Sequence, residues 1–225
     1  MSTKERLRRG IVAQFHNPTG VAGHVAGWIM GHRASNVARN RWAVELLEIE
    51  SGDRVLELGC GPGVALAAIA DRLLDGVAVG VDQSAVMVRH AQRRNATAIW
   101  TGRVHPVQIA VEDLLPVDSE REGPSPTETP PLNEPFDVVL AVNNVGVWDQ
   151  PSLRLVALRD LMRPGARIAL VSQPRCPGAT AATSQAAAIE LADLLDNAGY
   201  TAITPATLDL SPPAVCVRAT TARTH

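Results

Sequence analysis

An acidic residue followed at once by closely spaced glycines is the part of this chain best suited to binding a ligand. Residues 54–63 read Arg-Val-Leu-Glu-Leu-Gly-Cys-Gly-Pro-Gly, so an apolar run that contains Glu57 leads into Gly59, Gly61 and Gly63. Glycine adopts backbone conformations that strain other residues, and it lets a ligand approach the main chain closely. A helix-forming run follows directly, and the first N–H groups of a helix are free to bind polar ligands. We therefore expect a nucleotide-like ligand at this turn.

The residues around the turn distinguish between two such ligands. A dinucleotide fingerprint reads Gly-x-Gly-x-x-Gly, whereas here the third glycine comes one residue early and Pro62 stands in the loop. No Tyr-x-x-x-Lys pair is present for an NAD-dependent oxidoreductase, and the only tyrosine is Tyr200. S-adenosylmethionine (SAM) has no phosphate but carries a cationic sulfonium and an amino-acid tail, which favours a carboxylate such as Glu57. The next predicted strand ends at Asp82, whose two oxygens can accept hydrogen bonds from both ribose hydroxyls. The pattern thus favours SAM.

Four stretches together resemble a class I SAM-dependent methyltransferase. They are Glu57-Leu58-Gly59-Cys60-Gly61-Pro62-Gly63, Gly80-Val81-Asp82, Phe136-Asp137-Val138-Val139 and Leu161-Met162-Arg163-Pro164-Gly165-Ala166-Arg167. They lie within residues 54–172, about half of the chain. The resemblance implies an enzyme that uses SAM as its cofactor. A non-catalytic SAM-binding or scaffold domain of the same fold is the alternative, because fold alone does not establish activity.

The resemblance also assigns roles at the SAM site. Gly59, Gly61 and the Cys60 backbone would line the methionine end, and Glu57 would hold its ammonium group directly or through water. Asp82 would bind the ribose. The complete set of predicted cofactor-binding residues is Glu57, Gly59, Cys60, Gly61, Gly63, Asp82, Gln83, Val111, Glu112 and Asn143.

The resemblance leaves open, by one residue, which carboxylate contacts the adenine. Val111 would pack on the ring, and either Glu112 or Asp113 would accept from the adenine amino group. Asn143 ends a predicted strand, and ligands of open α/β sheets bind at the carboxyl ends of the strands.

The methyl acceptor has weaker sequence signals. An oxygen or nitrogen nucleophile can need a general base, and His16 is the first candidate because its Phe-His-Asn-Pro-Thr-Gly loop is not needed for packing. His24 and His32 lie in the same N-terminal stretch. His24, Asn144 and Trp148 are the predicted substrate contacts, with Trp148 as a wall of the site.

Short β-branched runs alternate with helix-length segments, which predicts an α/β fold with a mostly parallel sheet and helices on both faces. With the methyltransferase resemblance, we expect this sheet to be doubly wound and seven-stranded, with the order 3-2-1-4-5-7-6. The expected strands are Arg54–Leu58, Val77–Val81, Val107–Val111, Phe136–Val142, Arg167–Ser172, Thr201–Thr204 and Ala214–Ala219. Residues 1–50 are expected to form an N-terminal helical cap or lid, and residues 51–225 the SAM-binding domain. Within that domain, residues 123–135 hold five prolines and are predicted to be a flexible surface loop.

Composition limits the partners. The formal net charge is −2, which gives no general electrostatic case for nucleic acid. No apolar run has the length of a membrane span. The three cysteines are far apart and lack metal-site spacing, so we expect a cytoplasmic protein without a metal. The acceptor is expected to be a small, fairly apolar molecule such as a phenol, a quinol or a carboxylate. A homodimer is left open.

Overall fold

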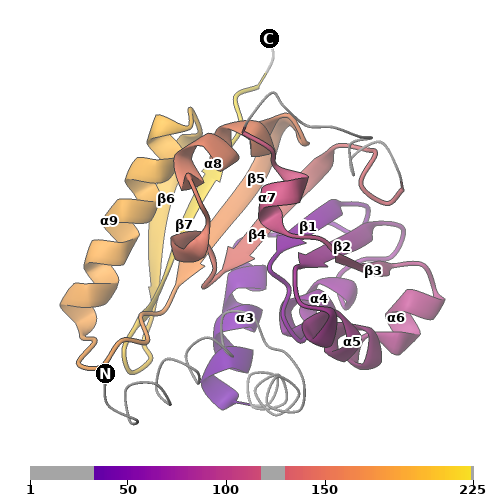
Figure 1. Ribbon diagram of the computed structural model, residues 1–225, viewed down its shortest axis with the longest axis horizontal. Helices are drawn as coiled ribbons and strands as arrows, with labels where there is room; N and C mark the ends of the chain where they lie inside the picture. Colours follow the sequence, from indigo (N-terminus) through magenta and orange to yellow (C-terminus); the bar gives the residue numbers. More distant parts are fainter. Residues whose placement is uncertain (1–32, 118–129, 224–225) are drawn as a thin grey trace, which may run out of the picture.

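A seven-stranded sheet forms the centre of the computed structural model, which describes residues 33–117 and 130–223 (Figure 1). Its strands are β1 (Arg54–Leu58), β2 (Val77–Asp82), β3 (Val104–Gln108), β4 (Phe136–Val142), β5 (Met162–Ser172), β6 (Thr201–Leu208) and β7 (Ala214–Thr220). Their order is β3-β2-β1-β4-β5-β7-β6, as the sequence predicts. The first five strands pair in parallel, and β7 pairs antiparallel with both β5 and β6.

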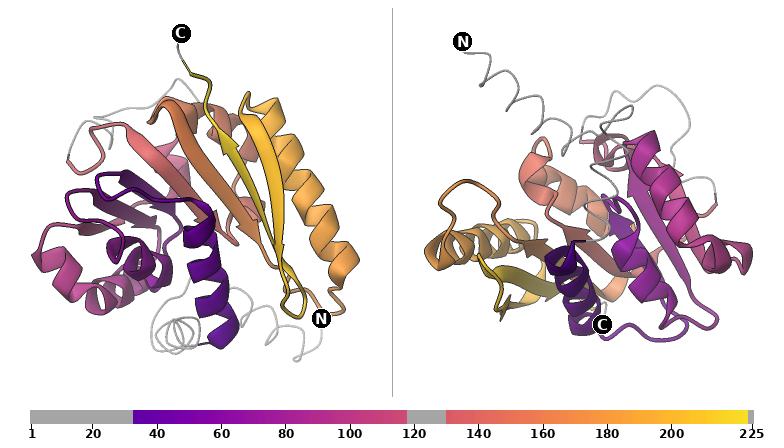
Figure 2. Two further views of the ribbon diagram at one scale, coloured as in Figure 1. Left: turned by 180° about the vertical axis from the view of Figure 1, so that it is seen from behind. Right: turned by 90° about the horizontal axis from the view of Figure 1, so that it is seen from below.

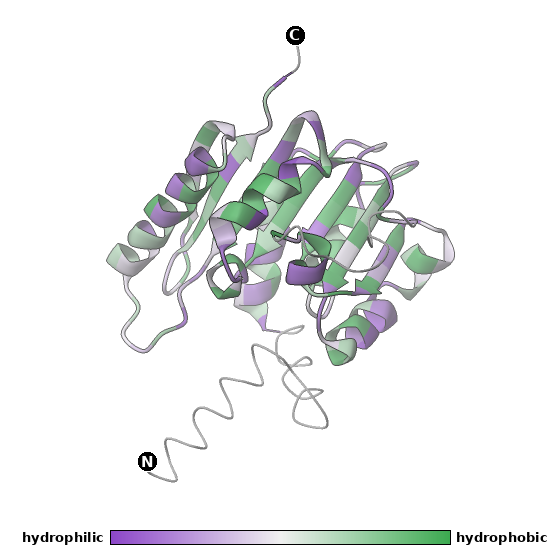
Figure 3. Cartoon of the chain, turned by 45° about the horizontal axis from the view of Figure 1, so that its top comes forward, coloured by the Kyte–Doolittle hydropathy of each residue, from purple (hydrophilic) through white to green (hydrophobic). Residues whose placement is uncertain are grey.

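Alternate residues of each strand pack on opposite faces of the sheet. In β1, Leu56 and Leu58 belong to one apolar core and Val55 belongs to the other. The first core is covered by α7 (Val111–Leu114), α8 (Pro151–Arg159) and α9 (Ala181–Asn197), and the second by α3 (Ala34–Leu46), α4 (Val64–Ala70), α5 (Ala85–Arg94) and α6 (Ala96–Trp100). The strands are accordingly hydrophobic along much of their length (Figure 3). Such runs are expected for parallel strands buried on both faces.

Helix α3 lies across one face of the sheet. Figure 2 (left) shows this face, because it views the molecule from behind relative to Figure 1. Ala43, Val44 and Leu47 are at most 2% exposed and share a core with α4. At its far end, Leu46 and Leu47 accept hydrogen bonds from Arg218 and Arg167. The described part of segment 1–50 therefore packs as a layer of the main fold. A lid function for residues 1–32 falls outside the described residues and stays a prediction.

Two differences from the sequence-based elements affect the site. The third strand is Val104–Gln108 and not Val107–Val111, so Val111 begins helix α7. Pro106 fits within β3 because β3 is an edge strand, where a missing N–H leaves no partner unpaired. Leu132, within the predicted surface loop 123–135, is only 5% exposed and packs in the core of α7 and α8.

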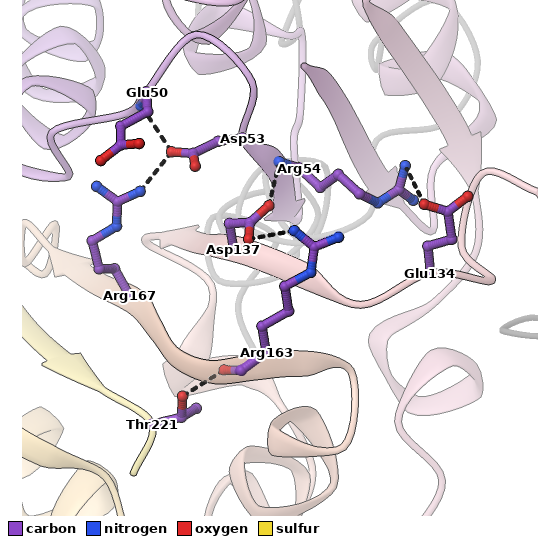
Figure 4. A network of polar contacts seen from close by, with 8 residues as sticks. All are labelled: Glu50, Asp53, Arg54, Glu134, Asp137, Arg163, Arg167 and Thr221. Atoms are coloured by element: carbon purple, nitrogen blue, oxygen red, sulfur yellow. Dashed lines mark hydrogen bonds and ion pairs between the residues drawn. The ribbon is translucent and has the colours of Figure 1, made fainter. Parts of the chain in front are cut away.

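Arginine–carboxylate pairs join the strands at the amino end of the sheet (Figure 4). Arg167 contacts Asp53 at 2.5 Å, and Arg163 contacts Asp137 at 2.7 Å. The other oxygen of Asp137 accepts the backbone N–H of Arg54 at 2.9 Å. The carboxylates of this edge are thus satisfied by the protein itself.

Candidate functional site

The turn between β1 and α4 is built from glycines in the left-handed region. Gly59, Gly61 and Gly63 have φ values of +68°, +51° and +73°. The backbone N–H of Cys60 donates to the carbonyl of Val81 at 2.9 Å, which ties the turn to β2. Residues other than glycine are strained at such φ values. The conformation of the turn therefore requires glycine at these three positions.

The three glycines of the turn differ in the space that surrounds them. A Cβ added to Gly59 would come within 2.1 Å of the side-chain nitrogen of Asn144, which in turn donates to the carbonyl of Leu58. A Cβ on Gly63 would lie 2.9 Å from Ala91. A Cβ on Gly61 would have nothing within 4 Å among the described residues. The turn is therefore packed at both ends and open at its middle glycine, where a ligand can approach the backbone.

Glu57, at the end of β1, is a buried carboxyl group with spare acceptor capacity. It is 2% exposed, and it accepts a hydrogen bond from the backbone of Leu66 in α4. Its Oε2 and the Oδ1 of Asn144 are buried, and neither has a donor among the described residues. Burial, and then the charge of Asp82, raise the pKa of Glu57 well above its usual range. A buried acceptor without a donor is costly, so a ligand with several N–H donors, such as an ammonium group, fits this place.

Asp82 ends β2 and faces the glycine turn. One oxygen accepts the N–H of Gly61 at 2.9 Å, and the other accepts the N–H of Ser84 at 2.8 Å. Burial raises the pKa of Asp82, while these two bonds oppose the rise. Each oxygen has a further lone pair. The carboxylate is thus held in place with two acceptor positions left for a diol.

Asn143 and Asn144 follow β4 at the same edge of the sheet. Asn143 has a φ of +56°, and its Oδ1 accepts the backbone N–H of Gln173, just beyond β5, at 2.6 Å. The predicted contact Asn143 thus joins the carboxyl ends of β4 and β5. Asn144, predicted as a substrate contact, donates from its amide nitrogen to the carbonyl of Leu58, and its buried oxygen has no donor within residues 33–117 and 130–223.

The predicted adenine contacts lie on α7. Val111 is buried, Glu112 is half-buried and Asp113 is exposed. Gln83 is exposed, and its carbonyl accepts from the side chain of Gln108 at 3.4 Å. Arg154, which no sequence motif singles out, is 5% exposed and donates to the carbonyl of Leu115 at the end of α7, at 2.5 Å.

The remaining predicted residues are placed as follows. Trp148 is 8% exposed and packs in the core with Val145. The Cys60 thiol is buried, and burial raises its pKa well above the usual range, so it is a poor nucleophile. His16, His24 and His32 lie outside the described residues.

A mostly parallel sheet with a glycine turn after its first strand, a carboxyl group near the end of that strand and another at the end of the second, defines a Rossmann-like nucleoside-binding domain. The chain belongs to the methyltransferase domain family, whose model matches residues 56–168. It is a SAM-dependent methyltransferase, as the sequence motifs predict. The alternative of an NAD-dependent oxidoreductase is set aside.

Individual relatives agree with this assignment. An uncharacterized methyltransferase, YdaC of Bacillus subtilis (strain 168), is 29% identical over 151 residues, which cover 67% of this chain and 72% of that protein. A SAM-dependent methyltransferase from Aquifex aeolicus superposes with a TM-score of 0.65 at 15% identity, covering 88% of this chain and 97% of that one. Magnesium protoporphyrin IX methyltransferase from Synechocystis PCC 6803, solved with bound SAM, gives 0.56 at 15% identity, covering 95% and 90%. At such identities these structures support the fold.

Residues 33–117 and 130–223 contain neither a candidate membrane-spanning helix nor a candidate metal cluster. None of the helices there has the length and hydrophobicity required to cross a membrane. These ranges also contain no group of three or more His, Cys, Asp or Glu side chains placed to hold a metal ion.

Proposed function

We propose that this methyltransferase methylates an O or N atom of a small, fairly apolar molecule of the phenol, quinol or carboxylate type. The observation that carries the donor side of this proposal is the placement of Glu57 and Asp82 on either side of the open Gly61 turn. When bound, SAM would supply an electrophilic methyl group, to which the acceptor atom forms a bond as the methyl–sulfur bond opposite it breaks and S-adenosylhomocysteine leaves as a neutral thioether. The chain's own contribution is to hold and orient the two reactants, which can supply much of the acceleration.

The residues present fit SAM at three points. The unpaired oxygens of Glu57 and Asn144 match the donors of an ammonium group. The lone pairs left on Asp82 match two ribose hydroxyls. The open side of Gly61 leaves room for the ligand beside the backbone. We assign the adenine to Val111 with Glu112 or Asp113, Gln83 to the ribose or adenine edge, and the methionine end to Gly59, the Cys60 backbone and Asn143.

We assign the methyl acceptor to the carboxyl edge of the sheet on the side of β4, next to the SAM site. Asn144 and Trp148 follow β4 at this edge, and we assign the acceptor contacts to them. His24 is proposed to contact the acceptor and His16 to act as the general base. A small acceptor agrees with the net charge of −2, which offers little attraction to nucleic acid. Homodimer formation is compatible with this assignment.

The proposal is tested in two stages. Isothermal titration with SAM and with NAD should give binding of SAM alone. Transfer of radiolabelled methyl groups is then measured over a panel of phenols, quinols, carboxylates, amines, a short RNA and a short DNA duplex. Labelling of a small phenol, quinol, carboxylate or amine supports the proposal. Preferential labelling of nucleic acid would overturn the small-molecule assignment, and SAM binding without any transfer would favour a non-catalytic SAM-binding domain.

A further inference from the structure

Three arginines gather where the first turn of α3 meets the segment after β5. Arg33 is the N-cap residue of α3, Arg39 lies within α3, and Arg175 follows β5. We call them the arginine cluster. Arg39 is only 5% exposed, and its Nε has no hydrogen-bond partner among the described residues. No carboxylate of the described residues pairs with any of the three, whereas Arg163 and Arg167 at the amino edge each meet one.

Among the described residues, both burial and like charge act against the positive charges of the cluster. Burial, with the charges of Arg175 and Arg33, lowers the pKa of Arg39 to about 9. Burial and Arg33 also lower the pKa of Arg175. Arg39 nevertheless remains a cation at neutral pH, because its pKa still lies above 7. A buried charge is costly when no carboxylate lies beside it, and the described residues place none there, so this site is suited to an anionic ligand.

Hydrogen bonds connect the cluster to the edge that holds the SAM site. Arg39 Nη1 donates to the side-chain oxygen of Gln173 at 2.8 Å, and the backbone N–H of Gln173 donates to Asn143 at 2.6 Å. Gln173 itself is fixed by a 2.9 Å bond from its amide nitrogen to the carbonyl of Pro212. Arg175 donates to the side chain of Asn36 in α3. The cluster is thus anchored beside the carboxyl ends of β4 and β5.

The start of α3 adds to the positive potential. This helix is 13 residues long, its N-cap makes no side-chain hydrogen bond, and its first turn contains no acidic residue. The N-terminus of a helix favours negative charge. Here it coincides with a buried arginine that has a spare donor, so two independent features point to an anionic ligand.

We propose that the arginine cluster binds an anionic group of the methyl acceptor, a carboxylate or a phosphate-type oxyanion, which the acceptor keeps after methylation. This inference rests on the proposed function and narrows its substrate class. Guanidinium groups suit both oxyanions because their N–H donors form paired hydrogen bonds with two oxygens. The methylated atom then lies elsewhere on the acceptor, toward Asn143 and the glycine turn. Arg39 and Arg175 therefore act as specificity-determining residues.

The test uses the full chain loaded with S-adenosylhomocysteine and three matched probes. Benzoate, phenyl phosphate and the neutral benzamide are titrated calorimetrically. We expect saturable binding of one or both anions and none of benzamide, and the better anion distinguishes a carboxylate from a phosphate acceptor. Arg39→Met should weaken anion binding about tenfold or more, since a hydrogen bond to a charged group is lost. Arg39→Lys should restore part of it.

Arg218→Met is the matched control. Arg218 also has a buried Nε for which the described part of the chain offers no partner, but its Nη1 donates to the carbonyl of Leu46 at the opposite end of α3. Removing it deletes the same charge and should leave anion binding unchanged. Arg175 is exposed, so Arg175→Met tests the cluster without disturbing the core.

The outcomes separate this inference from the proposed function. Intact binding of S-adenosylhomocysteine with no anion binding, or equal losses in Arg39→Met and Arg218→Met, would overturn the anion site alone. Anion binding that is unaffected by Arg175→Met and Arg39→Lys would also overturn it. Anion binding that depends on Arg39 in a protein that binds neither SAM nor S-adenosylhomocysteine would leave the site standing and contradict the proposed function.

Discussion

The carboxylate of Asp82 accepts the backbone N–H of Gly61 at 2.9 Å, so the end of β2 holds the middle of the turn that follows β1. The same carboxylate accepts the N–H of Ser84, whose own side chain caps α5 through Met87. One acidic group therefore orders the glycine turn and the start of a helix, and it presents its remaining lone pairs to the ligand. Its removal should affect both folding and SAM binding.

Asp82→Asn should weaken SAM binding about 10- to 100-fold and lower the melting temperature. An asparagine would turn an NH2 group toward one of the two N–H donors, so a charge-assisted bond worth about 1.5–3 kcal/mol is lost. Calorimetric titration and thermal unfolding measure the two effects. Asp137→Asn is the control, because Asp137 also accepts a backbone N–H, at the amino edge. It should destabilise the fold and leave SAM affinity unchanged; equal loss of SAM binding in both variants would contradict the ribose role of Asp82.

Much of the fold was predictable from local signals. The bounds of β1 and β4 agree with the sequence prediction, because both are central strands that are buried except at Arg54, Asp137 and Val142. The third strand was misplaced because Pro106 suggests a break, and only its position at the edge of the sheet makes the proline acceptable. Whether a strand lies at the edge depends on how the whole sheet assembles, so the local sequence around Pro106 does not predict it.

The candidate site likewise contains residues that the sequence predicts and residues that it does not. Glu57 is the penultimate residue of β1 and Asp82 is the last residue of β2, so their positions follow from the strands. The arginine cluster could not be predicted, because Arg39 and Gln173 are 134 residues apart and only the packing of α3 on the sheet brings them together. Neither residue belongs to a motif.

Glu57→Gln should stabilise the folded chain at neutral pH while weakening SAM binding. The pKa of Glu57 is raised in the folded state, mainly by burial. Above the ordinary carboxyl pKa the unfolded chain is ionised while the folded chain keeps its proton, so this group's contribution to stability falls as pH rises toward the folded pKa. Glutamine has no proton to lose and escapes this penalty. Each kcal/mol gained would raise the melting temperature by about 2–4 °C in a chain of this size.

Binding should show the matching pH dependence in the wild type. An ammonium group favours ionised Glu57, so SAM affinity should increase with pH and binding should release protons. Titration in buffers of different ionisation enthalpy measures the number released. Glu57→Gln should bind SAM weakly with less proton release. A variant that keeps full affinity, or that is destabilised at neutral pH and not at acidic pH, would refute the assigned role.

His16→Gln should lower the turnover number of methyl transfer by about 10²–10⁴-fold if His16 is the general base. SAM affinity should not change, because the predicted cofactor set does not include His16. The pH profile of the steady-state rate in the wild type should fall on the acidic side as the general base becomes protonated. His16→Gln should remove this fall. His105→Gln is the control, since the ring nitrogen of His105 lies 3.0 Å from the carbonyl of Gly102, away from the carboxyl edge of the sheet. Unaltered turnover in His16→Gln would remove His16 from the mechanism.

Gly59→Ala should destabilise the fold and weaken SAM binding through two separable effects. A side chain at φ +68° costs about 1–2 kcal/mol, and the new Cβ would also collide with Asn144, 2.1 Å away. Gly102→Ala isolates the first effect, because Gly102 has a φ of +74° and nothing lies within 4 Å of its Cβ among the described residues. Gly59→Ala should therefore lose more stability than Gly102→Ala. In the double variant Gly59→Ala/Asn144→Ala the collision is gone, so its loss of stability should be smaller than the sum of the single losses. Chemical denaturation of the four proteins alongside the wild type measures this coupling, and strictly additive losses would show that Asn144 does not press on the glycine turn.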